Sequence, residues 1–271
     1  GLFVLIGISS FTKPDTHFLI YILSAVSTVL IITFVGIFDD LAVLAGRTHD
    51  KRLGLKQWQK PLLTLPAAVP LMAVLAGDST ISLPFVGALN IGVLYPLILI
   101  PLGVVGAANA VNMLAGLNGL ETGTGAVIIF FLSSFAYVNG SVDAAAIGFI
   151  TVATLLAFLI FNWYPAKIFP GDSLTYLIGA VIAVIAILGN IEKFALFCFA
   201  PWFLEFALKA KGKLKIESFG ILQKDKTLKS PKRIHSLTHI VMKLGKFKEW
   251  QISLILISLV AAWCSFVWVI I

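Results

Sequence analysis

Residues 18–40 read FLIYILSAVSTVLIITFVGIFDD, an apolar run that ends in two adjacent carboxylates, Asp39 and Asp40. The run is long enough to cross a bilayer as one helix, so we expect the two acids at its C-terminal end, where it meets water. That end of a helix carries partial negative charge, and neighbouring carboxylates repel each other. Either a bound cation or the basic residues between Arg47 and Lys60 must offset this charge, unless the acids are simply solvated at a hydrated helix end.

Composition identifies an integral membrane protein. Of the 271 residues, 59% are hydrophobic and 12% are charged, whereas about a quarter of the residues of a soluble domain are charged. The two cysteines, Cys198 and Cys264, lie inside apolar runs, which indicates packed or lipid-facing thiols rather than a disulfide framework or a metal cluster. We predict an all-α polytopic membrane protein in which residues 1–271 form a single transmembrane domain.

Run length predicts nine apolar segments of about membrane-spanning size. They cover residues 1–11, 18–38, 61–76, 91–111, 122–138, 144–161, 173–189, 194–208 and 250–271. The first segment lacks the features of a signal peptide, and we expect it to be the tail of a helix that begins before residue 1.

Positive charge is concentrated on one side of this predicted bundle. Of the 20 Lys and Arg residues, all except Lys13 and Lys193 fall in the alternate loops 39–60, 162–172 and 209–249. The positive-inside rule places these loops, together with loop 112–121, in the cytoplasm. The net charge of +7 therefore belongs to one membrane face, where it suits anionic lipids or a phosphate-bearing substrate rather than nucleic acid.

Polar side chains gather at the membrane boundary of the same face. Besides Asp39 and Asp40 they are Asn109, Asn112, Asn118, Glu121, Asn162 and Asp172. Carboxylates and carboxamides rimmed by lysines are what a magnesium-bound diphosphate requires. Simpler readings stay open for single residues, because Asp172 directly after Gly171 is also a good helix cap and the glycines near residue 119 suit a turn or close helix packing.

Three strings resemble a known family of membrane enzymes. They are FDDL at residues 38–41, NAVNMLAGLNGLE at residues 109–121 and NWYPAKIFPGD at residues 162–172. In this order they are similar to the signature loops of the polyprenyl-phosphate N-acetylhexosamine-1-phosphate transferases, and NWYP is most similar to the dolichyl-phosphate N-acetylglucosamine-1-phosphate transferases of archaea and eukaryotes. The resemblance implies a ten-helix fold with a cytoplasmic active site, so nine segments agree with a first helix that lies outside this sequence.

The resemblance also implies roles for individual residues. Asn112 and Asp172 would ligate Mg²⁺, with Mn²⁺ as an alternative ion. Asp39, Asp40 and Lys60 would form the catalytic group at the polyprenyl-phosphate end of the site, with Lys60 on phosphate and Asp39 as either a base or a positioning group. For the nucleotide, the resemblance implies that Phe169 packs on the uracil ring, that Asn118 and Gly119 hold the base, and that Glu121 belongs to the substrate site in a role left open.

The basic loop 209–249 departs from the eukaryotic members. KGKLK at residues 211–215 replaces an Arg-His-Arg cluster, so Lys213 and Lys215 keep phosphate attraction without bidentate geometry. Residues 230–239, SPKRIHSLTH, stand where bacterial muramoyl-pentapeptide transferases carry three consecutive histidines, which argues against that donor. We expect Arg233 and His235 to contact substrate. A zinc site on His235 and His239 is less favoured, because the sequence offers no third ligand for it. Residues 216–222 and 227–229 are expected to form a small hairpin.

The sequence thus predicts a magnesium-dependent transfer of N-acetylglucosamine-1-phosphate from UDP-N-acetylglucosamine to a polyprenyl or dolichyl phosphate, with release of UMP. One alternative is the same reaction with another UDP-sugar or undecaprenyl phosphate. A transporter of anions is an alternative of another class, which would need ionisable groups along a path through the membrane. We expect a prokaryotic, archaeal plasma membrane rather than the endoplasmic reticulum, and leave a homodimer open.

Overall fold

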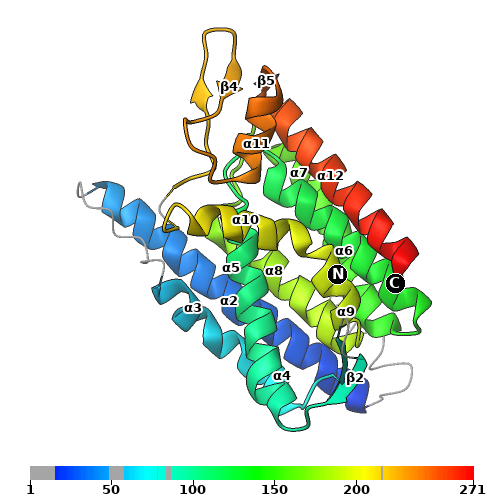
Figure 1. Ribbon diagram of the computed structural model, residues 1–271. Coiled ribbons are helices and arrows are strands. Elements are labelled where there is room, and N and C mark those ends of the chain that lie inside the picture. Colours follow the sequence, from blue (N-terminus) through cyan, green and yellow to red (C-terminus); the bar gives the residue numbers. More distant parts are fainter. Residues whose placement is uncertain (1–15, 49–57, 78, 84–86, 215) are drawn as a thin grey trace.

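The computed structural model describes residues 16–48, 58–77, 79–83, 87–214 and 216–271 as a bundle of helices with two small sheets (Figure 1). The predicted segment 1–11, the basic residues 49–57 and Lys215 lie outside the described residues. In chain order, the longer helices are α2 Thr16–Thr48, α5 Ile100–Met113, α6 Leu120–Val138, α7 Val142–Asn162, α8 Gly171–Leu188, α10 Ala200–Ala210 and α12 Glu249–Ile270. The shorter ones are α3 Gln59–Thr64, η1 Leu65–Ala68, α4 Val69–Ala73, η2 Tyr95–Leu99, α9 Glu192–Cys198 and α11 Leu237–Leu244.

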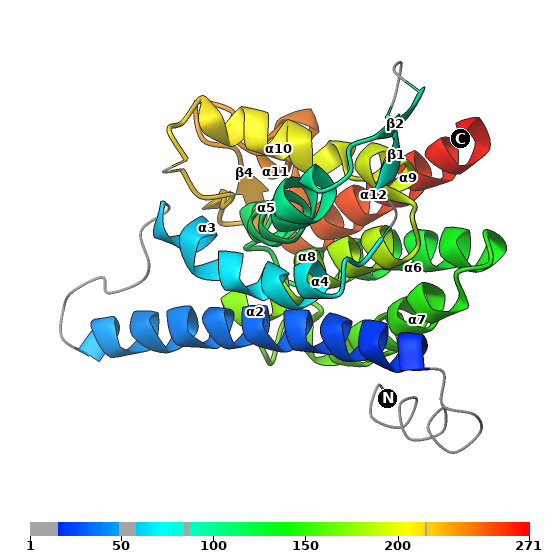
Figure 2. The same ribbon diagram turned by 90° about the horizontal axis from the view of Figure 1, so that it is seen from below.

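Helix α8 is the centre of the bundle. It packs against α2, α5, α6 and α7 (Figures 1 and 2), and its side chains from Thr175 to Ile187 are almost all buried. Helix α12 packs on α6 and α9. Among the described residues, six helical stretches are long and apolar enough to cross a membrane, which confirms a polytopic all-α membrane protein.

Prolines explain why two of the predicted segments are not continuous spans in the described part of the chain. The segment 61–76 is divided into α3, η1 and α4, with Pro66 and Pro70 in the first turns of η1 and α4. The segment 194–208 is divided at Phe199 into α9 and α10, and Pro201 starts α10. Proline cannot donate the helical hydrogen bond, so it begins helices and interrupts longer ones.

The small sheets lie in the loops at the two ends of the bundle (Figure 1). One is a hairpin of β1 Thr80–Leu83 and β2 Gly87–Asn90. The other has the order β3-β4-β5, with β3 Ile221–Leu222, β4 Thr227–Lys229 and β5 Phe247–Lys248. The predicted hairpin in the basic loop is therefore confirmed, and β5 adds a third strand that the sequence did not indicate.

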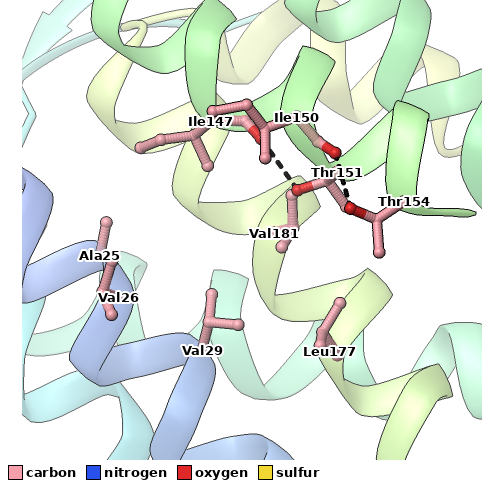
Figure 3. Close-up of a pocket in the computed structure, with 9 residues that line it drawn as sticks. All are labelled: Ala25, Val26, Val29, Ile147, Ile150, Thr151, Thr154, Leu177 and Val181. Carbon is pink, nitrogen blue, oxygen red and sulfur yellow. Dashed lines mark hydrogen bonds between the residues drawn. The ribbon is translucent and has the colours of Figure 1, made fainter. Parts of the chain in front are cut away.

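An apolar pocket of about 220 Å³ opens between α2 and α7 over α8 (Figure 3). Its two polar residues are Thr151 and Thr154, whose hydroxyls donate to the carbonyls of Ile147 and Ile150 in their own helix. The lining thus offers hydrocarbon and no ionisable group, so the chemistry of the protein lies elsewhere.

Candidate active site

Lys60 lies between two carboxylates that come from distant parts of the chain. Its Nζ atom is 2.8 Å from Asp39 Oδ2 and 2.5 Å from Asp172 Oδ2. The side chain of Asp39 is 1% exposed, and those of Lys60 and Asp172 are 17% and 24% exposed. The cluster therefore joins α2, α3 and α8, and the alternative of a hydrated helix end is wrong for Asp39.

Asp40 has a different task from its neighbour. Its carboxylate accepts hydrogen bonds from the backbone N–H groups of Asp172, at 2.8 Å, and of Ser173, at 3.1 Å. These groups lie in the first turn of α8, where N–H groups lack helical partners. The expectation that Asp172 caps its own helix is wrong, because Asp40 supplies the cap and leaves the Asp172 side chain for Lys60.

The two acids also do not stand at the end of their helix, as the sequence suggested. Helix α2 continues nine residues beyond Asp39, to Thr48. The negative charge that was expected to be unfavourable at a helix C-terminus is instead met by the ammonium of Lys60 and by the positive N-terminal end of α8.

Glycines allow this close approach of α2 and α8. A Cβ atom on Gly36 would lie 2.5 Å from Ser173 Cα and 2.7 Å from Ser173 N, which are backbone atoms that cannot move aside. Gly171 has a φ of +63°, and its Cα faces the Asp40 carboxylate. The Asp40 cap therefore depends on a glycine in each of the two helices.

Tyr176 and Asn112 extend the cluster toward α5. The Lys60 ammonium lies 5.9 Å from the centre of the Tyr176 ring, and the Asn112 side chain lies beside the Tyr176 hydroxyl. Burial alone would lower the pKa of Lys60, but the charge of Asp172 and the hydrogen bonds to Asp172 and Asp39 outweigh it and raise the pKa above its ordinary value. Lys60 is thus a permanent cation at neutral pH.

The neighbouring loop 114–119 connects α5 to α6 and carries the predicted nucleotide residues. The buried carboxylate of Glu121 accepts a hydrogen bond from Gly116 N–H, so Glu121 supports the conformation of this loop, and its place in the substrate site stays a prediction. Gly119 has a φ of +76° and lies against the ring of Trp163. Asn118 is held through its own backbone by Glu249 and Ser253.

Phe169 lies on the segment that joins α7 to α8. Phe169 is 73% exposed, which suits stacking on a base. Asn162 fixes the segment, since its amide accepts from the Thr122 hydroxyl at 2.8 Å and donates to the Ile168 carbonyl at 3.0 Å.

The basic loop forms a cavity of about 330 Å³. Lys211, Lys213, Arg233 and His235 line it together with Gly212, Ile216 and Pro231. Two groups that are distant in sequence therefore meet, as the predicted roles of Lys213, Arg233 and His235 require. His235 is 6% exposed, and neither of its ring nitrogens has a hydrogen-bond partner within the described part of the chain.

His239 supports this cavity and does not line it. Its Nδ1 accepts from the backbone N–H of His235 at 3.3 Å, and its Nε2 lies 3.1 Å from the Phe219 carbonyl. Only a neutral ring with its proton on Nε2 makes both hydrogen bonds. The i, i+4 histidine pair is therefore a structural contact, and the structured residues contain no group of three His, Cys, Asp or Glu side chains arranged around a metal.

Acidification is expected to destabilise α11 and the residues that pack around His239. Burial lowers the pKa of His239 below its ordinary 6.5. Below pH 6.5 the unfolded region around His239 therefore binds more protons than the folded one, and its stability falls as the pH falls. Hydrogen exchange of α11, corrected for intrinsic rates, should accelerate between pH 7.5 and 5.5. His239→Gln keeps an amide donor for Phe219 without a titrating ring and should flatten the response; unchanged exchange in the wild type would contradict the prediction.

The residues at the lysine cluster fit a magnesium ion. The Asp39 and Asp172 carboxylates lie 2.8 and 2.5 Å from the same Lys60 ammonium, and two carboxylates with one ammonium leave a net charge of −1. Magnesium takes one or two carboxylates and fills its remaining positions with waters and phosphate oxygens. Tyr176 follows Asp172 by one turn of α8, and Asn112 of α5 lies close to Tyr176. The carboxamide of Asn112 would therefore be able to supply a further oxygen to the ion.

Two residues near the site were missed by the sequence analysis in this role. Tyr176 carries the contact between Lys60 and Asn112. Glu205, fully buried in α10, accepts hydrogen bonds from Ser236 Oγ at 3.1 Å and from Leu237 N–H at 2.7 Å. It thereby fixes the residues that follow His235. A buried acid in an apolar run was the only sequence signal for Glu205.

Fold and site together define a polytopic membrane protein that gathers cationic and carboxylate groups at one end of its helix bundle. Residues 22–190 match the profile of glycosyl transferase family 4. The chain is 40% identical to a putative UDP-N-acetylglucosamine--dolichyl-phosphate N-acetylglucosaminephosphotransferase of Saccharolobus solfataricus, over 84% of this chain and 68% of the relative. It is 38% identical to a protein of the same name from Sulfolobus acidocaldarius, over 87% of this chain and 69% of that relative.

A bacterial relative is more distant. The phospho-N-acetylmuramoyl-pentapeptide-transferase of Levilactobacillus brevis is 34% identical over 95% of this chain and 75% of the relative. The chain therefore belongs to glycosyl transferase family 4. This assignment makes the protein a transferase and removes the transporter alternative.

Proposed function

We propose that the protein transfers N-acetylglucosamine-1-phosphate from UDP-N-acetylglucosamine to a polyprenyl phosphate, dolichyl phosphate in the first instance, and releases UMP. The names of the two archaeal relatives support this donor and acceptor. The same relatives favour an archaeal plasma membrane as the location. A homodimer stays a prediction.

The observation that carries the proposal is the ammonium of Lys60 between Asp39 and Asp172. In the reaction an oxygen of the lipid phosphate forms a bond to the sugar-side phosphorus, while the bond from that phosphorus to the UMP oxygen breaks and its electron pair leaves with UMP. Lys60 would hold the phosphates, since the lipid phosphate is already largely dianionic at neutral pH and needs positioning more than proton removal. Asp39 is then a positioning group for Lys60.

Magnesium on Asp172 and Asn112 would neutralise charge on the diphosphate. The lysines and Arg233 around the cavity of the basic loop would bind the remaining charge. Phe169 and Asn118 would contact the uracil ring.

The test is release of UMP by purified protein from UDP-N-acetylglucosamine, with dolichyl and undecaprenyl phosphates as acceptors and UDP-N-acetylmuramoyl-pentapeptide as a competing donor. Asp172→Asn is expected to abolish magnesium-dependent turnover, because it removes a ligand charge and the partner of Lys60. Asp225→Asn, at the exposed turn between β3 and β4, is the matched control and should leave turnover unchanged. Full magnesium-dependent activity in Asp172→Asn would refute the proposed site, and turnover of the pentapeptide donor alone would refute the proposed substrate.

A further inference from the structure

Loop 114–119 needs partners from outside itself. It contains two glycines with positive φ, Gly116 at +120° and Gly119 at +76°, so its peptide groups cannot all pair as they do in a helix. Buried or partly buried peptide groups without a hydrogen bond are costly. The side chains that satisfy them therefore decide which conformation the loop adopts.

Two side chains of helix α12 form hydrogen bonds with the backbone N–H and carbonyl groups of Asn118 in this loop. Glu249 Oε1 accepts from Asn118 N–H at 2.8 Å, and Ser253 Oγ donates to the Asn118 carbonyl at 2.9 Å. Glu249 and Ser253 are four residues apart on one helix, so they present one face to the loop. Ser253 is completely buried. We call this pair of hydrogen bonds the α12 clamp.

Other contacts make the clamp rigid. Helices α6 and α12 pack closely enough that a Cβ atom on Gly123 would lie 2.3 Å from Ile257 Cδ1. The residue before Glu249 belongs to β5, which pairs with β4 of the basic loop. The clamp therefore connects the loop that contains Asn118 to β4 and β5 of the small sheet, and β4 belongs to the same basic loop whose other residues line the cavity.

We propose that Glu249 and Ser253 are positioning residues, which set the pose of Asn118 toward the nucleobase of the donor. This inference rests on the proposed function, in which Asn118 contacts uracil. A side chain whose peptide is already fixed loses less conformational entropy when a ligand binds. The clamp should consequently strengthen binding of the nucleotide and leave binding of the lipid phosphate unaffected.

The variants Glu249→Ala, Glu249→Gln and Ser253→Ala test this role. Loss of one hydrogen bond to the Asn118 peptide should raise KM for UDP-N-acetylglucosamine and Kd for UMP by about tenfold, with KM for the polyprenyl phosphate unchanged. Glu249→Gln retains a side-chain oxygen that can accept from Asn118 N–H, and should recover most of the loss. Ser265→Ala is the matched control on the same helix, because its hydroxyl donates to the Ala261 carbonyl of its own helix and to no other group among the described residues.

The outcomes separate the clamp from the proposed function. A wild-type protein that binds no UMP would overturn the proposed function and this inference with it. A wild-type protein that binds UMP, with equal affinity in Glu249→Ala and Ser253→Ala, would overturn only the clamp. Equal rises in KM for both substrates, together with a lower Tm, would also overturn it, because that pattern marks a helix that is merely destabilised.

Discussion

Lys60→Ala is expected to lower turnover by on the order of a thousandfold. The substitution leaves Asp39 and Asp172 facing each other without their shared cation, and removing one group that stabilises developing charge costs about 2.7–4 kcal/mol of activation free energy. Each 1.36 kcal/mol corresponds to about a tenfold change in rate. The phosphates of the donor would then meet uncompensated negative charge. Initial rates of UMP release measure the effect directly.

A control variant separates this effect from a general loss of positive charge. Lys224→Ala removes an exposed lysine from the turn between β3 and β4 and should retain full turnover. Lys60→Arg should recover only part of the activity, because the planar guanidinium does not reproduce a compact ammonium between two carboxylates. Turnover within a few-fold of wild type in Lys60→Ala would show that the phosphates bind elsewhere.

Gly36→Ala is expected to reduce both stability and turnover although it lies outside the ion cluster. The new methyl group would lie 2.5 Å from Ser173 Cα, so α2 must move away from α8. That movement lengthens the hydrogen bonds from Asp40 to the start of α8 and separates Asp39 from Asp172. Overpacking of this kind lowers the free energy of unfolding by about 1–3 kcal/mol. Because misplacing catalytic groups by about 1 Å can cost about a hundredfold in rate, we expect turnover to fall by about ten- to a hundredfold.

Gly106→Ala is the matched control for this prediction. Gly106 lies in α5, and a Cβ atom there would have nothing within 4 Å. Alanine should be neutral or stabilise the helix by up to about 1 kcal/mol, with turnover unchanged. Thermal unfolding and UMP release should be measured on both variants. An unaltered Tm and rate in Gly36→Ala would contradict the inferred backbone contact.

The class of protein and much of the site could be predicted from the sequence. Run length and the distribution of charge predicted a polytopic membrane protein, and the strings around Asp39, Asn112 and Asp172 marked residues that the fold brings to one end of the bundle. Lys60 was predicted to contact phosphate; the fold places it between Asp39 and Asp172, two other residues of the predicted site, and the phosphate contact stays a prediction. These signals are local, because each depends on residues within one segment.

The geometry that depends on pairs of segments could not be predicted. The basic residues up to Lys60 were expected to offset the charge of the Asp39-Asp40 pair, and Lys60 does so for Asp39. The second counter-charge, the N-terminus of α8 that binds Asp40, comes from a distant segment that the sequence does not connect to this pair. Asp172 looked like a helix cap because the sequence does not reveal that Asp40, 132 residues earlier, already fills that position. Glu249 and Ser253 lie 131 and 135 residues from Asn118, in an apolar helix where neither residue marks a motif.

The length of α2 before Asp39 also bears on the depth at which the reaction would take place in the membrane. At 1.5 Å per residue, the rise from Phe18 to Asp39 is about 32 Å, close to the thickness of the hydrocarbon layer. The apolar stretch of α2 begins at Phe18, and a helix that enters the hydrocarbon layer at this residue would bring Asp39 and Lys60 to the level of the lipid headgroups. A phosphate at the end of a polyprenyl chain can therefore reach the lysine while the whole chain stays among the acyl tails, and the enzyme need not extract its acceptor from the bilayer.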